Sequence, residues 1–131
     1  MDDKVAALRA VPLFADLDDR SLQAVAVLAR ELATKAGDVL TLEGEPGDAF
    51  YVIVDGTVRV EHGDRTVRSM TAGGFLGEIA LVERGARTAT ATCVTDCRLL
   101  EIRRDEFERL LETLPEVRSR IGSAIARRAR D

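Results

Sequence analysis

Short runs of β-forming residues alternate with turn residues through the middle of the chain. Between residues 31 and 103 the turns fall about 7 to 10 residues apart, at Gly37 and Asp38, Gly44 to Asp48, Asp55 and Gly56, Gly63 and Asp64, and Gly73 and Gly74. This spacing is typical of a small antiparallel sandwich or barrel. The segments TVRV and TVRSM alternate apolar with polar residues, so each is expected to bury one face. The Asp55-Gly56 pair between YVIV and TVRV predicts a two-residue hairpin.

An amphipathic helix is expected before the first strand. Asp16 or Asp18 can cap this helix, which would run to about Ala33. Its apolar stripe has helical spacing and consists of Leu22, Val25, Ala26, Leu28, Ala29 and Leu32.

Two further helices are expected after the strands. Asp105 can cap a helix over residues 107–114, with Glu108 as its capping-box partner. Pro115 cannot continue that helix but can open a last one, from residue 116 to about 130. The expected fold is α+β and mainly β. It is an antiparallel β-roll, a jelly-roll-like double-stranded β-helix, with helices on both sides.

The composition limits the classes of protein to which the chain can belong. With 131 residues, 46% of them hydrophobic, it is expected to form a single domain over residues 1–131. A net charge of −4 argues against nucleic-acid binding as the main function. No apolar run reaches the roughly 18 residues that a membrane span needs, and the acidic N-terminus is unlike a secretory signal. We therefore expect a cytoplasmic protein with no membrane segment and no direct contact with nucleic acid.

Residues that could carry catalysis or bind a metal are scarce. His62 is the sole histidine, so the several histidines of a cupin-type metal site are missing. No serine stands in a context that would give it a histidine base. Cys93 and Cys97 are the only cysteines, and they are expected to be buried structural thiols. The sequence thus favours a non-enzymatic protein without a metal or a cofactor.

The segment from Phe75 to Ala91, FLGEIALVERGARTATA, has the features of an anion site. Gly77 lacks a Cβ and lets the backbone approach a ligand closely. Residues 78–82 can form one or two helical turns, whose first N–H groups are available to a phosphate. Arg87 follows a loop, and its fork of donors suits a phosphate or a carboxylate. Glu78 is better used to accept from sugar hydroxyls, so the segment predicts a small phosphorylated nucleoside as ligand.

This segment resembles the phosphate-binding cassette of the cyclic nucleotide-binding domain family, of the catabolite activator protein and protein kinase A regulatory subunit type. The matching residues are Phe75, Gly77-Glu78-Ile79-Ala80-Leu81 and Arg87-Thr88-Ala89, with Leu76 as an extra residue after the aromatic. The resemblance runs in order from Val11 to about Arg128, through Pro12 to Phe14, Gly37 and Asp38, Glu43 to Asp48, and Tyr51 to Gly56. It implies the family's β-roll, with an N-terminal helix, a short cassette helix and two C-terminal helices.

The resemblance also implies roles for individual residues. The phosphate would bind at the cassette helix and Arg87, and Glu78 would accept from the ribose 2′-hydroxyl. Thr88 would reach the phosphate or the base. Arg128 in the last helix would pair with Glu78, although a helix ending at Asp131 is expected to be an incomplete lid. The expected ligand-binding set is completed by the apolar wall beside the purine, Val60, Val67 and Leu76, and by Gly77, Ile79, Ala80 and Ala89 of the cassette.

The implied function is a sensor that binds a cyclic nucleotide and relays binding by helix movement to an unidentified effector protein or domain. The apolar wall accepts any purine, and cAMP is expected modestly ahead of cGMP, with the Thr88 hydroxyl as the feature that favours guanine. The chain could also form a homodimer. Alternatives remain: a ligand-free protein–protein module with the same fold, or a regulatory domain cut from a larger channel, transporter or transcription regulator. A degenerate module would be expected to have lost Arg87 or Glu78, and this chain keeps both.

Overall fold

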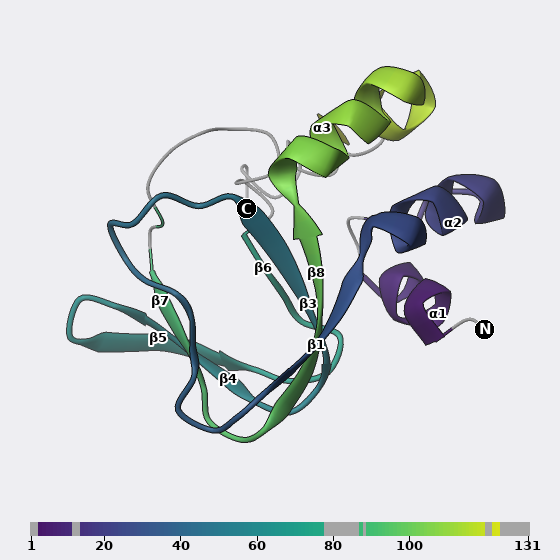
Figure 1. Ribbon diagram of the computed structural model, residues 1–131. Coiled ribbons are helices and arrows are strands. Elements are labelled where there is room, and N and C mark those ends of the chain that lie inside the picture. The colour runs from purple at the N-terminus through teal and green to yellow at the C-terminus, as the bar shows by residue number, and fades with distance from the viewer. Residues whose placement is uncertain (1–2, 12–13, 78–86, 88, 120–121, 124–131) are drawn as a thin grey trace.

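Helices gather on one side of the molecule and strands on the other (Figure 1). The computed structural model describes residues 3–11, 14–77, 87, 89–119 and 122–123. Its helices are α1 (Asp3–Arg9), α2 (Asp19–Leu28) and α3 (Arg104–Thr113), and residues 115–119 are also helical. α1 contacts α2, α2 contacts α3, and α3 follows directly from the last strand.

The strands form two four-stranded sheets in which every described pair is antiparallel. The first sheet has the order β1 (Arg30–Thr34), β8 (Cys97–Arg103), β3 (Ala49–Asp55) and β6 (Phe75–Leu76). The second has the order β2 (Val39–Thr41), β7 (Thr90–Cys93), β4 (Val58–His62) and β5 (Arg65–Met70). The predicted antiparallel β-roll is therefore confirmed.

Two apolar clusters hold these layers together. One fills the space between the two sheets, and its buried members are Ile53, Val58, Val60, Leu76, Ala91, Cys93, Cys97 and Leu99. The other lies between the helices and the first sheet, around Phe14, Phe50 and Phe107. The Phe14 ring meets the Phe50 ring edge to face at a centroid distance of 5.7 Å, and the Phe107 ring at 6.4 Å. Such pairs add stability beyond the area they bury, so the helices are fixed to the back of the sheet.

The hairpin predicted at Asp55 and Gly56 is wrong. β3 and β4 lie in different sheets, so the turn carries the chain from one layer to the other. The alternation within β4 was predicted correctly, because Val58 and Val60 are buried. A two-residue turn signal predicts that the chain bends. It does not predict that the two flanking strands pair with each other, because each strand can pair with strands that are distant in the sequence.

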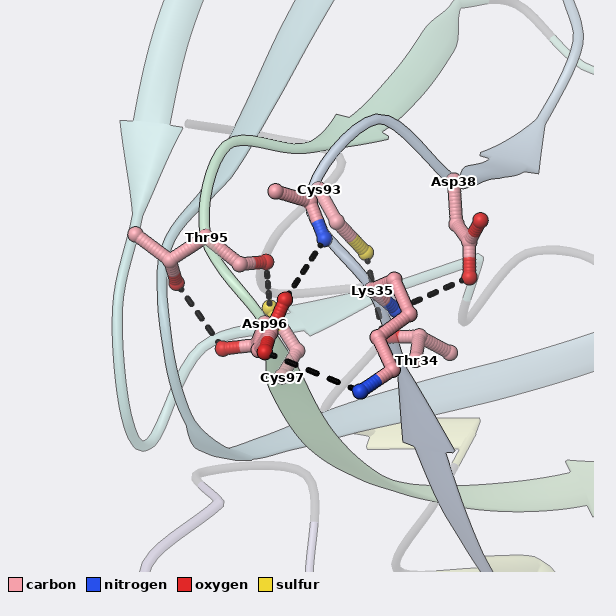
Figure 2. A network of polar contacts seen from close by, with 8 residues as sticks. Thr34, Lys35, Asp38, Cys93, Thr95, Asp96 and Cys97 are labelled. Atoms are coloured by element: carbon pink, nitrogen blue, oxygen red, sulfur yellow. Dashed lines mark hydrogen bonds and ion pairs between the residues drawn. The ribbon is translucent and has the colours of Figure 1, made fainter.

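Three crossings between the sheets meet at one corner, formed by residues 35–38, 55–57 and 94–96, which we call the crossing corner (Figure 2). Asp38 accepts from the Lys35 amide at 2.9 Å, and Asp96 accepts from the Ala36 amide at 2.9 Å. The Val94 amide donates to the Thr57 carbonyl at 2.8 Å. These bonds satisfy backbone groups that leave the sheet ladders at the crossings.

Cys93 and Cys97 border the crossing corner, and both are buried free thiols, as predicted. The Cys93 Sγ lies 3.3 Å from the Thr34 hydroxyl, and the Cys97 thiol donates to the Thr95 carbonyl at 3.3 Å. Burial raises the pKa of the Cys93 thiol above its usual value. Both thiols therefore serve as small core residues.

The first predicted helix starts as expected but ends earlier. Asp18 is its N-cap, and its carboxylate accepts from the Ser21 amide at 2.8 Å. α2 ends at Leu28, and not near Ala33, because the chain from Arg30 pairs with β8 as strand β1. Strand pairing thus overrides the helical spacing of the apolar residues.

The predicted cap at Asp105 is also wrong. α3 begins at Arg104 directly after β8, with Arg103 as its N-cap residue, and no side chain forms the cap bond. Asp105 lies in the first turn and accepts from the Glu106 amide at 2.9 Å. Pro115 does open the next helical segment, as predicted, over residues 115–119.

The first prediction concerns Gly56 in the crossing corner. Gly56 has a φ of +108°, and an added Cβ would lie 2.5 Å from the Cys97 Sγ and 2.7 Å from the Asp96 carbonyl oxygen. Gly37 has a similar φ of +95°, but a Cβ there would meet no atom within 4 Å. Gly37→Ala should therefore cost about 1–3 kcal/mol of backbone strain, and Gly56→Ala should cost about 1–3 kcal/mol more from overpacking. Urea unfolding of both variants measures the difference. Equal losses would show that the close approach to Cys97 contributes nothing.

Candidate functional site

The backbone at Arg87 is tied to the loop between β2 and β3. The Arg87 amide donates to the Glu45 carbonyl at 2.7 Å, and the Gly44 amide donates to the Arg87 carbonyl at 2.9 Å. Two residues on, the Thr41 hydroxyl donates to the Ala89 carbonyl at 3.0 Å. The path of the chain from Arg87 into β7 is thus fixed by residues that lie more than forty positions earlier.

The Arg87 side chain lies in a narrow space bounded by Gly47, Gly77 and the Ala49 carbonyl, which we call the arginine slot. Its Nη2 donates to the Ala49 carbonyl at 2.7 Å. A Cβ on Gly47 would lie 2.6 Å from the Arg87 Nε and 2.8 Å from its Cδ. A Cβ on Gly77, whose φ is +82°, would overlap the Arg87 Nη1 and approach the Ala49 oxygen to 2.9 Å. Both glycines are therefore needed for this placement of the guanidinium.

Burial dominates the electrostatics of the arginine slot. It lowers the pKa of the Arg87 guanidinium, and the nearby Arg104 charge acts in the same direction. Tyr51 and Asp48 oppose this by favouring the charged form. Burial also raises the pKa of the Tyr51 phenol, followed in size by the effect of the Glu101 charge. Within the described residues Arg87 forms no ion pair with a carboxylate, so the slot presents a partly desolvated cation that suits an anion.

Arg104 joins the arginine slot to α3. Its Nη1 donates to the Gly47 carbonyl at 2.6 Å, and its amide donates to the Asp48 carbonyl at 2.8 Å. Its Nε lies 3.4 Å from the Glu108 carboxylate, one turn further along α3. Arg104, the first residue of α3, thus holds the backbone of Gly47. Because Gly47 has no Cβ, the Arg87 side chain can pack directly against it.

Sequence reasoning missed three of these residues: Gly47, Ala49 and Arg104. The Pro46-Gly47-Asp48 run indicates a turn and belongs to the segments that resemble the family, but neither interpretation predicts a contact with Arg87. Ala49 accepts a hydrogen bond from Arg87 through its backbone carbonyl, and a pattern of side chains cannot predict such a bond. Arg104 forms its bond across 57 residues of sequence. A glycine next to a turn-forming proline was the one available signal, and it does not say what approaches it.

The apolar residues expected near Arg87 come together between the sheets. Val60 on β4 and Leu76 on β6 are each 7% exposed and belong to one cluster, and Ala89 packs against it. Ala91 pairs directly with Val60 across the β4–β7 ladder. The structure thus gathers Val60, Leu76 and Ala89 in one apolar cluster between the sheets.

Other expected site residues lie outside the described part of the chain: Glu78, Ile79, Ala80, Thr88 and Arg128. The side chain of Val67 lies outside it as well, although its backbone belongs to β5.

The described residues form a further cavity but meet the requirements of neither a metal site nor a membrane-spanning helix. A cavity of about 270 Å³ is lined mainly by β1, β3 and β8, with Lys4, Glu31 and Arg98 among its lining residues, and Arg87 is not among them. No group of three or more His, Cys, Asp or Glu residues in the described ranges could hold a metal ion. None of the helices described is both long enough and apolar enough to cross a membrane.

Comparison with known proteins gives a consistent result. The family model for the cyclic nucleotide-binding domain matches residues 31–114. The chain is 36% identical over 120 residues to a cyclic nucleotide-gated potassium channel of Rhizobium etli, covering 91% of this chain and 34% of the channel. The chain thus spans about a third of the length of that relative.

Solved structures show the same fold. The N-terminal domain of a transcriptional regulator from Streptomyces coelicolor superposes with a TM-score of 0.87 at 33% identity, over 95% of this chain and 92% of that one. The regulatory domain of Toxoplasma gondii PKA, solved with cAMP, gives a TM-score of 0.76 at 31% identity, over 82% of this chain and 43% of that one. With the β-roll in place and the family model matching most of the strands and α3, the chain belongs to the cyclic nucleotide-binding domain family.

Proposed function

We propose that the chain is a non-enzymatic sensor that binds a 3′,5′-cyclic purine nucleotide with its phosphate at Arg87. The observation that carries this proposal is the arginine slot, where a partly buried guanidinium lies between two glycines. Its neutral hydrogen-bond partner is the Ala49 carbonyl at 2.7 Å. A cyclic phosphate would supply the negative charge that this cation lacks among the described residues.

The remaining parts of the nucleotide are assigned by chemistry and by family resemblance. The purine would lie against the apolar residues Val60 and Leu76, which border the space between the sheets. Glu78 would accept from the ribose 2′-hydroxyl, because an anion beside a phosphate is unfavourable unless it has a donor to accept from. Ile79, Ala80 and Thr88 would complete the cassette around the phosphate.

The response to binding would pass through the helices to an effector protein or domain. Arg104 supports this route, because it bonds the loop of the arginine slot and is the first residue of α3. A ligand that moves Arg87 would change the packing at Gly47. Because Arg104 donates to the Gly47 carbonyl, the position of α3 would change as well. We place this sensor in the cytoplasm, and a homodimer is compatible with it.

Removing the Arg87 guanidinium should abolish most of the affinity. Truncating one partner of a desolvated charge pair costs about 2–5 kcal/mol, so Arg87→Ala should weaken binding at least about tenfold. Arg87→Lys keeps the charge but loses the fork, and should lie between the parent and Arg87→Ala. Calorimetric titration with cAMP, cGMP and linear 5′-AMP measures these affinities. If the parent binds neither cyclic nucleotide at millimolar concentration, the chain is a ligand-free module. If Arg87→Ala binds as the parent does, the phosphate lies elsewhere.

Gly47 should affect affinity only through Arg87. In Gly47→Ala the new Cβ takes the space of the Arg87 Nε and Cδ, so the guanidinium must shift and binding should weaken about tenfold. Gly63→Ala is the control, since a Cβ there meets nothing within 4 Å; its φ of +63° makes this variant less stable, but its affinity should stay unchanged. In an Arg87→Ala background, Gly47→Ala should cause no further loss of affinity. An additive loss in the double variant would mean that Gly47 acts on the ligand by another route.

Glu78 should distinguish ribose from deoxyribose. The 2′-deoxy analogue should bind the parent about 10- to 150-fold more weakly, since a hydrogen bond to a charged acceptor contributes about 1.5–3 kcal/mol. Glu78→Gln should reduce this difference. The same titrations performed with both sugars provide the measurement, and equal affinity of the parent for the two sugars would remove Glu78 from the ribose site.

A further inference from the structure

The helices cover only part of the first sheet. On the side of the sheet that faces them, Leu100 on β8 pairs with Glu31 on β1 and with Val52 on β3. Leu100 and Val52 are buried in the cluster between the sheet and the helices. Arg98 lies two residues before Leu100, so it shares this face, but its side chain is exposed. The helical layer therefore ends between Leu100 and Arg98.

The cavity of about 270 Å³ lies at this edge of the helical layer. Ala33, Val54 and Leu100 are among the apolar residues that line it, and its charged lining residues are Lys4, Glu31 and Arg98. Pockets for drug-sized ligands measure about 300–1,000 Å³, so this cavity suits a smaller molecule.

The charged residues of this cavity are not paired with one another. Within the described ranges, the side chains of Glu31 and Arg98 form neither a hydrogen bond nor an ion pair, although Arg98 is the direct ladder partner of Asp55. The Lys4 ammonium donates to the Ala29 carbonyl at 2.7 Å, and an ammonium group has three donors. One apolar cavity thus presents a carboxylate and two cations, each able to accept a further partner.

This combination of charges selects the chemistry of the ligand. A simple carboxylate would be attracted by Lys4 and Arg98, but it would bring a second anion close to Glu31. A simple amine would meet the opposite problem. A molecule with both an ammonium and a carboxylate group would satisfy both signs of charge, and an aliphatic side chain on it would cover the apolar lining. We propose that the cavity is a second ligand site, separate from the arginine slot, for a free α-amino acid with a branched aliphatic side chain.

Such a ligand would join the helices to the sheet. Lys4 belongs to α1 and bonds to Ala29, the C-cap residue of α2, whereas Glu31 and Arg98 belong to β1 and β8. An amino acid held by these three side chains would bind only the folded protein. It should therefore raise the temperature of thermal unfolding as its concentration increases.

The test compares L-leucine with two analogues that each lack one charged group. Isocaproate lacks the ammonium group, and isoamylamine lacks the carboxylate. In titrations of the full chain followed by NMR, L-leucine should bind at millimolar or lower concentration and at least about threefold more tightly than either analogue. Glu31→Gln should remove the advantage of leucine over isocaproate, and Arg98→Gln should reduce its advantage over isoamylamine.

Matched control variants remove the same charges elsewhere. Asp64→Asn and Arg65→Gln change exposed residues at the turn between β4 and β5, in the second sheet, and should leave all the affinity ratios unchanged. Because Glu31 and Arg98 are also exposed, their variants should unfold within a few degrees of the parent in the absence of ligand. The stabilisation by L-leucine should be smaller in both of them.

The outcomes separate this inference from the proposed nucleotide site. Isocaproate that binds the parent as tightly as leucine would make the cavity a carboxylate site and overturn the proposal. An advantage of leucine that persists in Glu31→Gln would overturn it too, as would a parent that binds none of the probes at millimolar concentration. Arg87→Ala should bind L-leucine as the parent does, because Arg87 does not line this cavity. A loss of leucine binding in that variant would place the amino acid in the arginine slot and contradict a second site.

Discussion

The position of the Arg87 guanidinium depends on two glycines, Gly47 and Gly77, which have no side chain to occupy its space. Gly47 belongs to the loop between β2 and β3, and Gly77 directly follows β6, so the arginine slot exists only where these two segments meet. Any Cβ at either position would occupy the space of the guanidinium. The hydrogen bonds that join Arg87 to Glu45 and Gly44 set the same loop against the chain entering β7. The local geometry of the site thus follows from how closely three backbone segments approach one another.

This packing leaves a cation in a poorly solvated place. Moving a charge out of water costs free energy unless a partner of opposite charge or strong hydrogen bonds replace the water. The Ala49 carbonyl replaces one such bond, and Asp48 and Tyr51 favour the charged form from a distance. Among the residues that the structure describes, no carboxylate forms an ion pair with Arg87 to offset the rest of the cost. A phosphate would gain affinity by offsetting it, because it would supply the negative charge and the hydrogen-bond acceptors that replace water.

The sequence predicts those parts of the fold that depend on neighbouring residues. The Asp18 cap, the alternation in β4 and the cassette pattern are all local, and a local pattern suffices to identify them. The sheet change at Gly56 and the end of α2 at Leu28 depend on which distant strand pairs with the chain, which no turn or helix signal contains. The same limit explains the site: Arg87 and Gly77 stand in one motif, whereas Gly47 and Arg104 join it through contacts 40 and 57 residues apart.

The contacts of Gly47 also explain how a ligand that never touches α3 could move it. Gly47 packs against Arg87 on one side, and its carbonyl accepts from Arg104 on the other. The Arg104 side chain is only 16% exposed, so this charge-assisted bond is poorly screened by solvent. A displacement of Arg87 toward a phosphate would therefore alter the backbone to which the first residue of α3 is bonded. Coupling of this kind would be reciprocal: if the nucleotide changed the affinity of an effector for α3 by some factor, that effector would change the affinity of the arginine slot for the nucleotide by the same factor. An effector that binds the helices could then control nucleotide binding as directly as the nucleotide controls the effector.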